Sequence, residues 1–331
     1  MAKPQVTIIV VPRERFSYSR ESLESIYANT QVPFALIYVD GNSPKHIQAY
    51  LLAQSQLQNF KLIRSEHYLS PNQARNIGLA AVDTKYVVFL DNDVYVEPGW
   101  LEKLIDCAEA TDAAAVCPLV CLGKKPLSKQ KYNTICLAGG EAQIYLEIKK
   151  ATACRKVHYQ YYFANCLLVE VPEGLQRREC ELAKFHTLLV RTDIFAAIGQ
   201  LDEKLLSIQE DIDFCLAIIQ ARKKIYCEPN SVVTYVPAQN LTLSDLAYFE
   251  LRWSDAWELS SLKHFNQKWD LSEQSGAFSA NYPLGYHRHQ ALLRPVVKQL
   301  SFGGYAAWLE RLLAAGERKI NRYISDRYKY N

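Results

Sequence analysis

The sequence predicts an α/β protein built on a doubly wound, mostly parallel β-sheet, followed by a helical C-terminal extension. Continuous β-branched and aromatic runs of strand length, such as Val6–Val11, are typical of strands that helices cover on both faces. Segments of helical period separate these runs, and strands that alternate with helices predict a parallel sheet. Ligands of such sheets bind at the carboxyl ends of the strands, so we expect the functional site at that edge.

The first hundred residues contain four strand–helix repeats. The predicted strands are Val6–Val11, Ala35–Val39, Leu62–Ile63 and Tyr86–Leu90. The predicted helices are Ser19–Ala28, Lys45–Leu57, Pro71–Val82 and one that begins near Trp100. Ser70 is expected to be the N-cap of the third helix, with Pro71 at its first position, and Ser19 or Ser22 is expected to cap the first helix.

The pattern is less regular after residue 122. Residues 122–185 are basic and rich in tyrosine, with one expected strand at Ala142–Ile148 and a patch at Tyr159, Tyr161 and Tyr162. Such a segment can contact a substrate, and it can equally be a solvated flap. The elements expected after it are a strand at Leu188–Val190, helices at Thr192–Ile198 and about 210–221, and strands at Lys224–Cys227 and Ser231–Val236 joined by a turn at Pro229-Asn230.

We divide the chain into two parts. Residues 1–240 are expected to form the ligand-binding and catalytic domain, with about 122–185 as an insertion, and residues 241–331 a helical extension. Residues 275–290 are predicted to be an irregular loop. The last helix, Tyr305–Tyr328, has an apolar side and a basic side. It either docks on the domain or lies on an anionic membrane surface.

The composition excludes several classes of protein. The net charge of +3 on 331 residues gives no argument for a nucleic-acid partner. Nine cysteines without a Cys-x-x-Cys pair favour a reducing compartment over a disulfide framework. The N-terminal residues have no secretory pattern, and the longest apolar runs are too short for a membrane span, so we expect a cytoplasmic protein. No Gly-x-Gly-x-x-Gly follows the first strand, which argues against a dinucleotide enzyme.

The segment Asp91-Asn92-Asp93 follows a buried strand and is the first candidate site. Carboxylates at the end of such a strand are costly unless a cation neutralises them, and their hard oxygens suit Mg²⁺ or Mn²⁺. The alternative is a turn rich in Asp and Asn with solvated carboxylates.

A second acidic segment, Glu210-Asp211-Ile212-Asp213, occupies the first turn of a predicted helix. One or two of these acids can complement the helix dipole. Three in four residues repel one another, however, and indicate a cation or substrate nearby.

Five segments resemble, in this order, the motifs of family 2 glycosyltransferases with the GT-A fold. They are Val6–Pro12 (first strand), Val39–Ser43 (Asp-Asp-Gly-Ser), Asn72–Ala80 (Ala-Arg-Asn-x-Gly), Phe89–Asp93 (Asp-x-Asp) and Leu201–Asp213 (Gly-x-x-Asp-Glu … Glu-Asp-x-Asp). The resemblance covers about residues 5–236 and extends into the Arg252–Trp257 region. It implies a Rossmann-like GT-A domain and a nucleotide-diphosphate sugar as donor substrate.

The resemblance also implies roles for single residues. Pro12 and Asp40 are expected to line the base and ribose pocket, and Arg75 to lie close to the nucleotide. Asp91 is expected to reach the ribose or the metal's water, with Asn92 beside it among the donor-binding residues. Asp93, with Asp91, is expected to bind Mg²⁺ or Mn²⁺. The metal would offset the charge that grows on the leaving diphosphate.

The same resemblance implies an inverting mechanism. Asp211 is expected to be the general base that takes the proton from the acceptor hydroxyl, with Glu210 as the second candidate. The acceptor is expected to be a glycan, a lipid-linked sugar or a small molecule. Alternatives are a non-catalytic nucleotide-sugar binder that kept the fold and, third, a nucleotidyltransferase.

Two positions depart from the family pattern. Gly41 stands where the family often has a second Asp, and Tyr235 stands roughly where it often has a His that assists the metal or diphosphate. His186 is a possible substitute for that His, although a lone His is more often structural.

Overall fold

The computed structural model describes residues 4–124, 133–149, 152–171, 175–238, 241–272, 284–301 and 306–328. The strands are β1 (Val6–Val11), β2 (Ala35–Gly41), β3 (Lys61–Ser65), β4 (Tyr86–Asp91), β5 (Val94–Val96), β6 (Ala115–Leu122), β7 (Thr134–Leu137), β8 (Gly140–Lys149), β9 (Thr152–Tyr161), β10 (Arg178–Cys180), β11 (Thr187–Arg191) and β12 (Ile225–Tyr235). The main helices are α1 (Ser19–Asn29), α2 (Lys45–Gln58), α3 (Pro71–Leu79), α4 (Trp100–Thr111), α5 (Phe195–Ile198), α6 (Glu210–Gln220), α7 (Leu246–Arg252), α8 (Asp255–Lys268), α9 (Tyr286–Arg288), α10 (Arg294–Leu300) and α11 (Ala307–Arg327).

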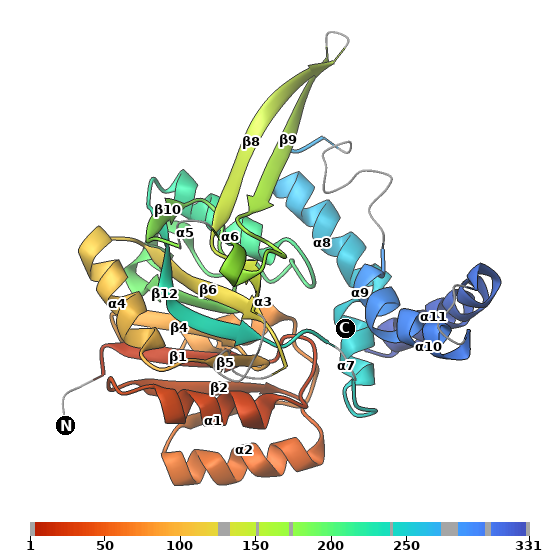
Figure 1. Cartoon of the computed structure of the whole chain (residues 1–331), viewed down its shortest axis with the longest axis horizontal. Coiled ribbons are helices and arrows are strands. Elements are labelled where there is room, and N and C mark those ends of the chain that lie inside the picture. The colour runs from red at the N-terminus through yellow and green to blue at the C-terminus, as the bar shows by residue number, and fades with distance from the viewer. Residues whose placement is uncertain are drawn as a thin grey trace.

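The central sheet has the strand order β10-β12-β6-β11-β4-β1-β2-β3, with β5 paired to β12 and β7 to β6. Strand β1 is parallel to both β2 and β4, and β12 is parallel to β6. Strand β11 runs antiparallel between β4 and β6. The predicted fold, a mostly parallel sheet wrapped by helices, is therefore confirmed (Figure 1).

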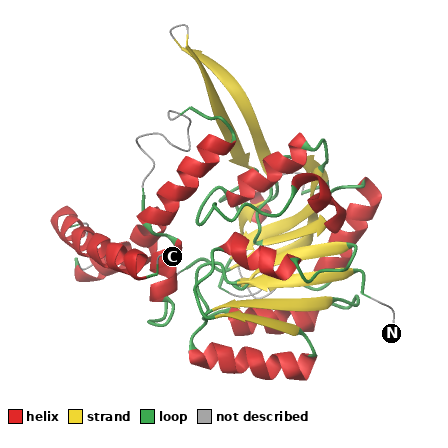
Figure 2. Ribbon diagram, turned by 180° about the vertical axis from the view of Figure 1, so that it is seen from behind, coloured by secondary structure: helices red, strands yellow, loops and turns green. Residues whose placement is uncertain are grey.

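Alternate residues of each strand face the two layers of helices, as the period of two requires. Ile9 and Val11 of β1 belong to the core beneath α3, α6 and α8, whereas Ile8 and Val10 belong to the core beneath α1, α2 and α4. The two helical layers on opposite faces of the sheet are visible in Figure 2. Helix α3 lies so close to β1 that a Cβ on Gly78 would come within 2.5 Å of Ile9 Cγ2, so this position requires glycine.

Two helix starts test the predicted caps. Ser70 is the N-cap of α3, as predicted, and the structure adds a complete capping box with Gln73. Helix α1 begins at Ser19, but its N-cap is Tyr18 and no side chain makes a cap hydrogen bond, so the prediction of Ser19 or Ser22 was wrong. The hydroxyl of Ser19 instead accepts a hydrogen bond from Asn92 Nδ2 at 2.9 Å.

The two strands predicted around a turn at Pro229-Asn230 form one strand, β12. Both of its halves pair with β6, and the register shifts between Glu228 and Val232. The carboxylate of Glu228 accepts hydrogen bonds from the backbone and side-chain nitrogens of Asn230, which holds a local irregularity without reversing the chain.

The middle segment contains a long β-hairpin of β8 and β9 that rises from the sheet (Figure 1). The sequence predicted part of β8 but not β9. The polar residues of β9 obscure the alternation of apolar and polar positions that is typical of a strand. Four of the lysines that make this segment basic lie outside the described residues: Lys125, Lys129, Lys131 and Lys150. Of the predicted loop at 275–290, residues 275–283 also lie outside them. Residues 286–288 are helical, so the end of that prediction was wrong.

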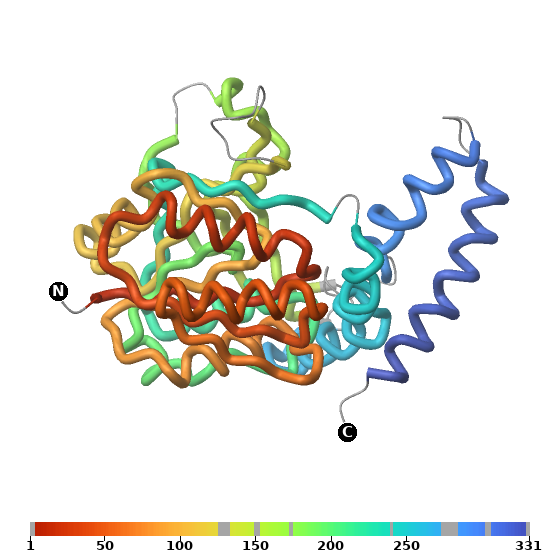
Figure 3. Tube along the Cα trace, turned by 90° about the horizontal axis from the view of Figure 1, so that it is seen from below, coloured from red at the N-terminus to blue at the C-terminus, as the bar shows by residue number. Residues whose placement is uncertain are grey.

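The C-terminal region is helical, as predicted, and α7 packs against the loops that follow β1 and precede α3. The hydroxyl of Tyr248 donates to the backbone oxygens of Pro12 and Leu69 at 3.1 and 3.2 Å. Helices α10 and α11 form a pair that projects from the rest of the molecule (Figure 3). None of the helices in the described ranges has the length and apolar character that crossing a membrane requires.

Candidate active site

A cavity of about 210 Å³ opens where the chain leaves β1 and β4 and where α6 begins. Its lining residues come from distant parts of the sequence: Arg13, Arg75, Asp91, Tyr159, Tyr161, Lys184, Phe185, His186, Ser207, Ile208, Gln209, Glu210, Asp211, Ile212, Arg252, Trp253 and His287. Four predicted site residues line it, namely Arg75, Asp91, Glu210 and Asp211. The predicted residues Pro12, Asp40, Asn92 and Asp93 are not among its lining residues.

Asp91 is held by three cationic groups. Its Oδ1 lies 3.1 Å from Arg75 Nη2, and its Oδ2 lies 3.1 Å from His186 Nδ1 and 3.4 Å from Arg13 Nε. Burial raises the pKa of Asp91, but His186, Arg75 and Arg13 outweigh burial, and the pKa lies below its ordinary value. Asp91 is therefore ionised and fixed in the cavity wall.

His186 lies opposite Asp91 because β11 is antiparallel to β4. Burial and Arg13 lower the pKa of His186, but its interactions with Asp91 and Cys136 together outweigh them and raise that pKa above the usual value. The imidazole also stacks on Tyr235, with ring centroids 4.2 Å apart. The sequence singled out His186 and Tyr235, but the contact between these two residues depends on the antiparallel register of β11.

Asn92 fixes the loop after β1. Its Nδ2 donates to the Arg15 backbone oxygen at 2.8 Å, and its Oδ1 accepts from the Arg13 backbone N–H at 3.2 Å. In the structure Asn92 positions Arg13, which itself lines the cavity.

Asp93 is buried, and neither carboxylate oxygen has a hydrogen-bond donor among the described residues. The nearest recorded cation is Arg15, whose Nε lies 3.7 Å from Oδ2. Burial raises the pKa of Asp93 to about 7. A buried carboxylate with unsatisfied hard oxygens fits a divalent cation, whereas the oxygens of Asp91 are already engaged.

The described residues contain no group of three or more His, Cys, Asp or Glu side chains that could hold a metal ion.

Asp40 and Pro12 lie at the ends of β2 and β1. Asp40 accepts hydrogen bonds from the backbone N–H and the hydroxyl of Ser43, each at 2.9 Å, and it pairs with Arg64. The backbone oxygen of Pro12 accepts from Tyr248. The contacts of both residues with a base or ribose stay predictions.

The three acids of α6 have three different environments. Glu210 Oε1 lies 2.7 Å from Arg252 Nη2, and Asp213 bonds Lys268 Nζ and Trp269 Nε1 at 2.8 and 2.9 Å. Burial raises the pKa values of Glu210 and Asp213 despite these partners. Asp211 Oδ1 accepts a hydrogen bond from the Phe185 backbone N–H at 2.9 Å. No ion pair joins Asp211 to another described residue, so it is the acid of this turn that faces the cavity without a cationic partner.

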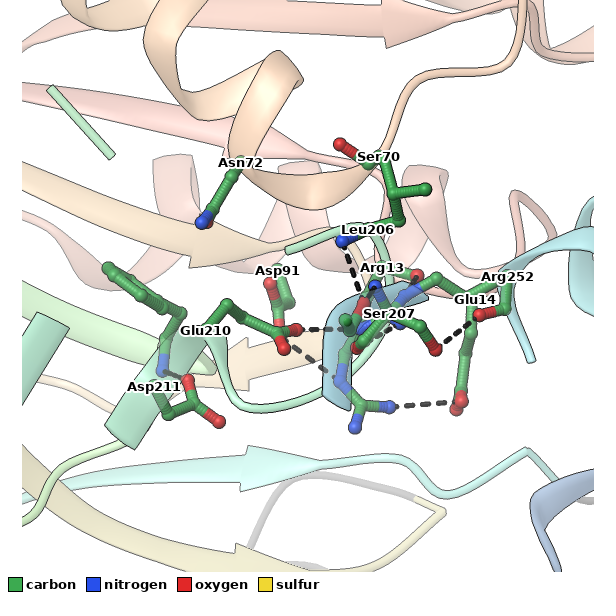
Figure 4. Close-up of polar contacts among 12 residues, drawn as sticks. Arg13, Glu14, Ser70, Asn72, Asp91, Leu206, Ser207, Glu210, Asp211 and Arg252 are labelled. Atoms are coloured by element: carbon green, nitrogen blue, oxygen red, sulfur yellow. Dashed lines mark hydrogen bonds and ion pairs between the residues drawn. The ribbon is translucent and has the colours of Figure 1, made fainter. Parts of the chain in front are cut away.

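The C-terminal region contributes cavity residues to which the sequence gave no role. Arg252 Nε donates to the Arg13 backbone oxygen at 3.1 Å (Figure 4). Trp253 Nε1 donates to Glu14 Oε2 at 2.9 Å. His287 stacks on Trp253 with centroids 3.8 Å apart, and burial lowers its pKa to about 4. One feature of the sequence indicated this contribution. The family resemblance extends into the Arg252–Trp257 region, although it assigned no role to these residues.

The base of the hairpin supplies an aromatic wall. Tyr159 and Tyr161 of β9 line the cavity, and Lys184 lies 4.5 Å from the Tyr161 ring centroid. Tyr162, the third tyrosine of the predicted patch, lies under Arg178 instead.

Comparison with known proteins identifies the family. Residues 7–163, which include β1–β9 and the loop with Arg13, match the model for Glycosyl transferase family 2. Residues 7–163 therefore belong to glycosyltransferase family 2.

The chain is 25% identical over 237 residues to the Pre-mycofactocin glycosyltransferase of Mycobacterium tuberculosis H37Rv, a stretch that covers 70% of this chain and 42% of that protein. The chain thus spans less than half the length of that relative. It is also 29% identical over 110 residues to the Succinoglycan biosynthesis protein ExoO of Rhizobium meliloti, covering 33% of this chain and 31% of that one.

Among solved structures, the crystal structure of GalNAc-T7 with UDP, GalNAc and Mn²⁺ superimposes with a TM-score of 0.52 at 16% identity. The match covers 85% of this chain and 58% of that one. This similarity establishes the GT-A fold of the chain.

Proposed function

We propose that this chain transfers a glycosyl group from a nucleotide-diphosphate sugar to an acceptor hydroxyl with inversion. The acceptor oxygen forms a bond to the anomeric carbon as the bond from that carbon to the diphosphate oxygen breaks. The acceptor proton goes to a protein carboxylate, and the nucleoside diphosphate leaves with the bonding electron pair. No oxidant or further reactant is needed.

The observation that carries the proposal is the position of Asp211. Its carboxylate lines the cavity, the Phe185 N–H orients one of its oxygens, and the adjacent acids are neutralised by Arg252 and Lys268. An oriented carboxylate without a cationic partner can accept a proton, which supports Asp211 as the general base. Glu210 is less suited, because its ion pair with Arg252 would have to break first.

Three arginines of the cavity suit the donor diphosphate. Arg13, Arg75 and Arg252 line the cavity, and buried contacts fix each guanidinium. Fixed cations stabilise negative charge as it develops on a leaving group, because they need no reorganisation during the reaction. This arrangement supports a diphosphate rather than a neutral ligand.

A divalent cation is the second part of the donor site in this proposal. Asp93 would hold Mg²⁺ or Mn²⁺, and the cation would offset charge on the diphosphate. The solved relative with UDP and Mn²⁺ supports this pairing of ligand and metal. Asp91 acts by positioning Arg13 and Arg75 and not as a direct ligand.

The acceptor is proposed to enter beside Tyr159 and Tyr161. Aromatic side chains present flat apolar faces together with hydroxyl groups, a combination that suits a sugar ring. The similarity to a succinoglycan biosynthesis protein supports a glycan or lipid-linked glycan as acceptor.

A donor panel tests the proposal. Thermal unfolding of the chain with Mn²⁺ and each of several nucleotide sugars should show stabilisation by at least one donor. That donor should then be hydrolysed slowly, with release of nucleoside diphosphate, and Asp211→Asn should keep donor binding but lose hydrolysis. Binding without turnover would instead support the non-catalytic binder. Formation of a nucleotide sugar from a sugar phosphate and a nucleoside triphosphate would support the nucleotidyltransferase.

A further inference from the structure

The last helix, α11, has one face attached to the protein and one face open to solvent. On the attached face, Asn321 Nδ2 donates to the backbone and side-chain oxygens of Glu250 on α7, at 2.8 and 2.7 Å. Tyr328 packs on Tyr68, with ring centroids 4.9 Å apart. Figures 1 and 3 show the pair of α10 and α11 projecting away from the sheet, so the opposite face of α11 meets none of the sheet layers.

Large apolar side chains gather on the open face. Trp308, Leu312, Ile320 and Tyr323 are 71%, 64%, 57% and 63% exposed. At 100° per residue their spacing of 4, 8 and 3 places all four within an arc of about 120°. Single exposed apolar residues are ordinary, but four large ones on one face of one helix form a stripe that indicates a binding surface.

Basic residues accompany this stripe. Arg311, Arg318 and Arg322 lie along one side of it, Lys319 lies within it, and all four are exposed. Two acids of α11 face inward instead: Glu310 pairs with His289, and Glu317 Oε1 lies 3.2 Å from Arg288 Nη1. The third acid, Asp326, is exposed at the same angle as Trp308, but the basic residues outnumber it. The open face therefore combines apolar side chains with a net positive charge.

We propose that the open face of α11 binds an anionic membrane surface, with the helix lying in the plane of the interface. Trp and Tyr favour the boundary between headgroups and acyl chains, and Arg and Lys can bury their stems while their charged ends reach lipid phosphates. A second copy of the chain is a poorer partner, because its identical face would bring like charges together. This inference does not depend on the transfer reaction.

The contact would also orient the active site. Asn321 binds Glu250, which lies two residues before Arg252 in the same helix, and Arg252 lines the cavity. Helix α7 thus contacts α11 through Glu250 and the cavity through Arg252.

Vesicle sedimentation tests the proposal with the full chain. The protein is mixed with vesicles of phosphatidylcholine alone or with about a third phosphatidylglycerol, at low and high salt. We expect at least ten-fold tighter binding to the anionic vesicles, weakened by salt. Trp308→Ser with Leu312→Ser should weaken binding ten-fold or more, and Arg318→Gln with Arg322→Gln should remove the preference for anionic vesicles.

Leu243→Ser is the matched control, because Leu243 is 90% exposed in the loop before α7. It should leave binding unchanged, and all variants should keep the wild-type unfolding temperature. Equal binding to both vesicle types, or no binding, would overturn the proposal. A dimer seen by light scattering and abolished by Trp308→Ser would overturn it in favour of self-association. Hydrolysis of the donor in solution tests the proposed transferase separately.

Discussion

Arg252 Nη2 lies 2.7 Å from Glu210 Oε1, and this ion pair joins the C-terminal helix α7 to the first turn of α6. Both side chains are almost fully buried. The pair closes one wall of the cavity and leaves Asp211, the next residue, as the acid without a cation. A contact between residues 42 positions apart thus separates the roles of two adjacent carboxylates.

Replacing Arg252 should be strongly destabilising. Arg252→Gln leaves Glu210 buried without its cation, and we expect a loss of about 3 to 5 kcal/mol in the free energy of unfolding, measured by urea denaturation. The double variant Arg252→Gln with Glu210→Gln should recover much of that loss, because no unpaired charge remains. If the double variant were as unstable as the single one, packing rather than charge would explain the effect.

Removing the proposed base should affect chemistry and leave binding intact. Asp211→Asn keeps the oxygen that accepts the Phe185 N–H, and we expect kcat for transfer to fall about 10² to 10⁴-fold with little change in donor affinity. Donor affinity is measured by calorimetry and kcat by release of nucleoside diphosphate. Glu210→Gln should lower kcat less than Asp211→Asn; the opposite order would make Glu210 the base.

Asp93 should be required for the effect of metal on the protein. With a nucleoside diphosphate present, Mn²⁺ at 100 times its Kd should stabilise the wild type by about 2.7 kcal/mol, and a chelator should reverse this. Asp93→Ala should abolish the Mn²⁺-dependent rise in unfolding temperature. Glu24→Ala is the comparison, because the Glu24 side chain is 58% exposed and pairs with Arg20 on the surface of α1. A preserved rise in Asp93→Ala would exclude Asp93 as the ligand.

Stability should fall as the pH rises from about 5 to 7. Burial raises the pKa values of Glu250 and Glu258 to about 7, so the folded chain holds protons that the unfolded chain has already released. Each such group contributes at most about 1.4 kcal/mol per pH unit to the slope. Glu250→Gln should make the dependence of the unfolding free energy on pH shallower.

The control for the pH experiment is Glu24→Gln, whose side chain is 58% exposed. It should keep the wild-type slope. A slope that Glu250→Gln leaves unchanged would mean that Glu250 does not titrate in this range.

The local sequence was sufficient for elements that depend on their own residues. Two predictions rested on signals within a few residues, and the structure confirms both. They are the strand at Val6–Val11 and the N-cap at Ser70. Strand β9 and the continuous β12 could not be read in this way, because the pairing of each strand depends on a partner that only the folded sheet supplies.

The sequence by itself determined the α/β class, the order of motifs and the acids at the ends of β4 and α6, because these follow from periodicity and neighbouring residues. The tertiary structure decided how those acids are used. It placed His186 and Arg13 on Asp91, left Asp93 without hydrogen-bond donors among the described residues, and brought Arg252 to Glu210. Hydrogen bonds and ion pairs form only when their atoms lie within about 3 to 4 Å, so they depend on contacts that chain order alone does not reveal.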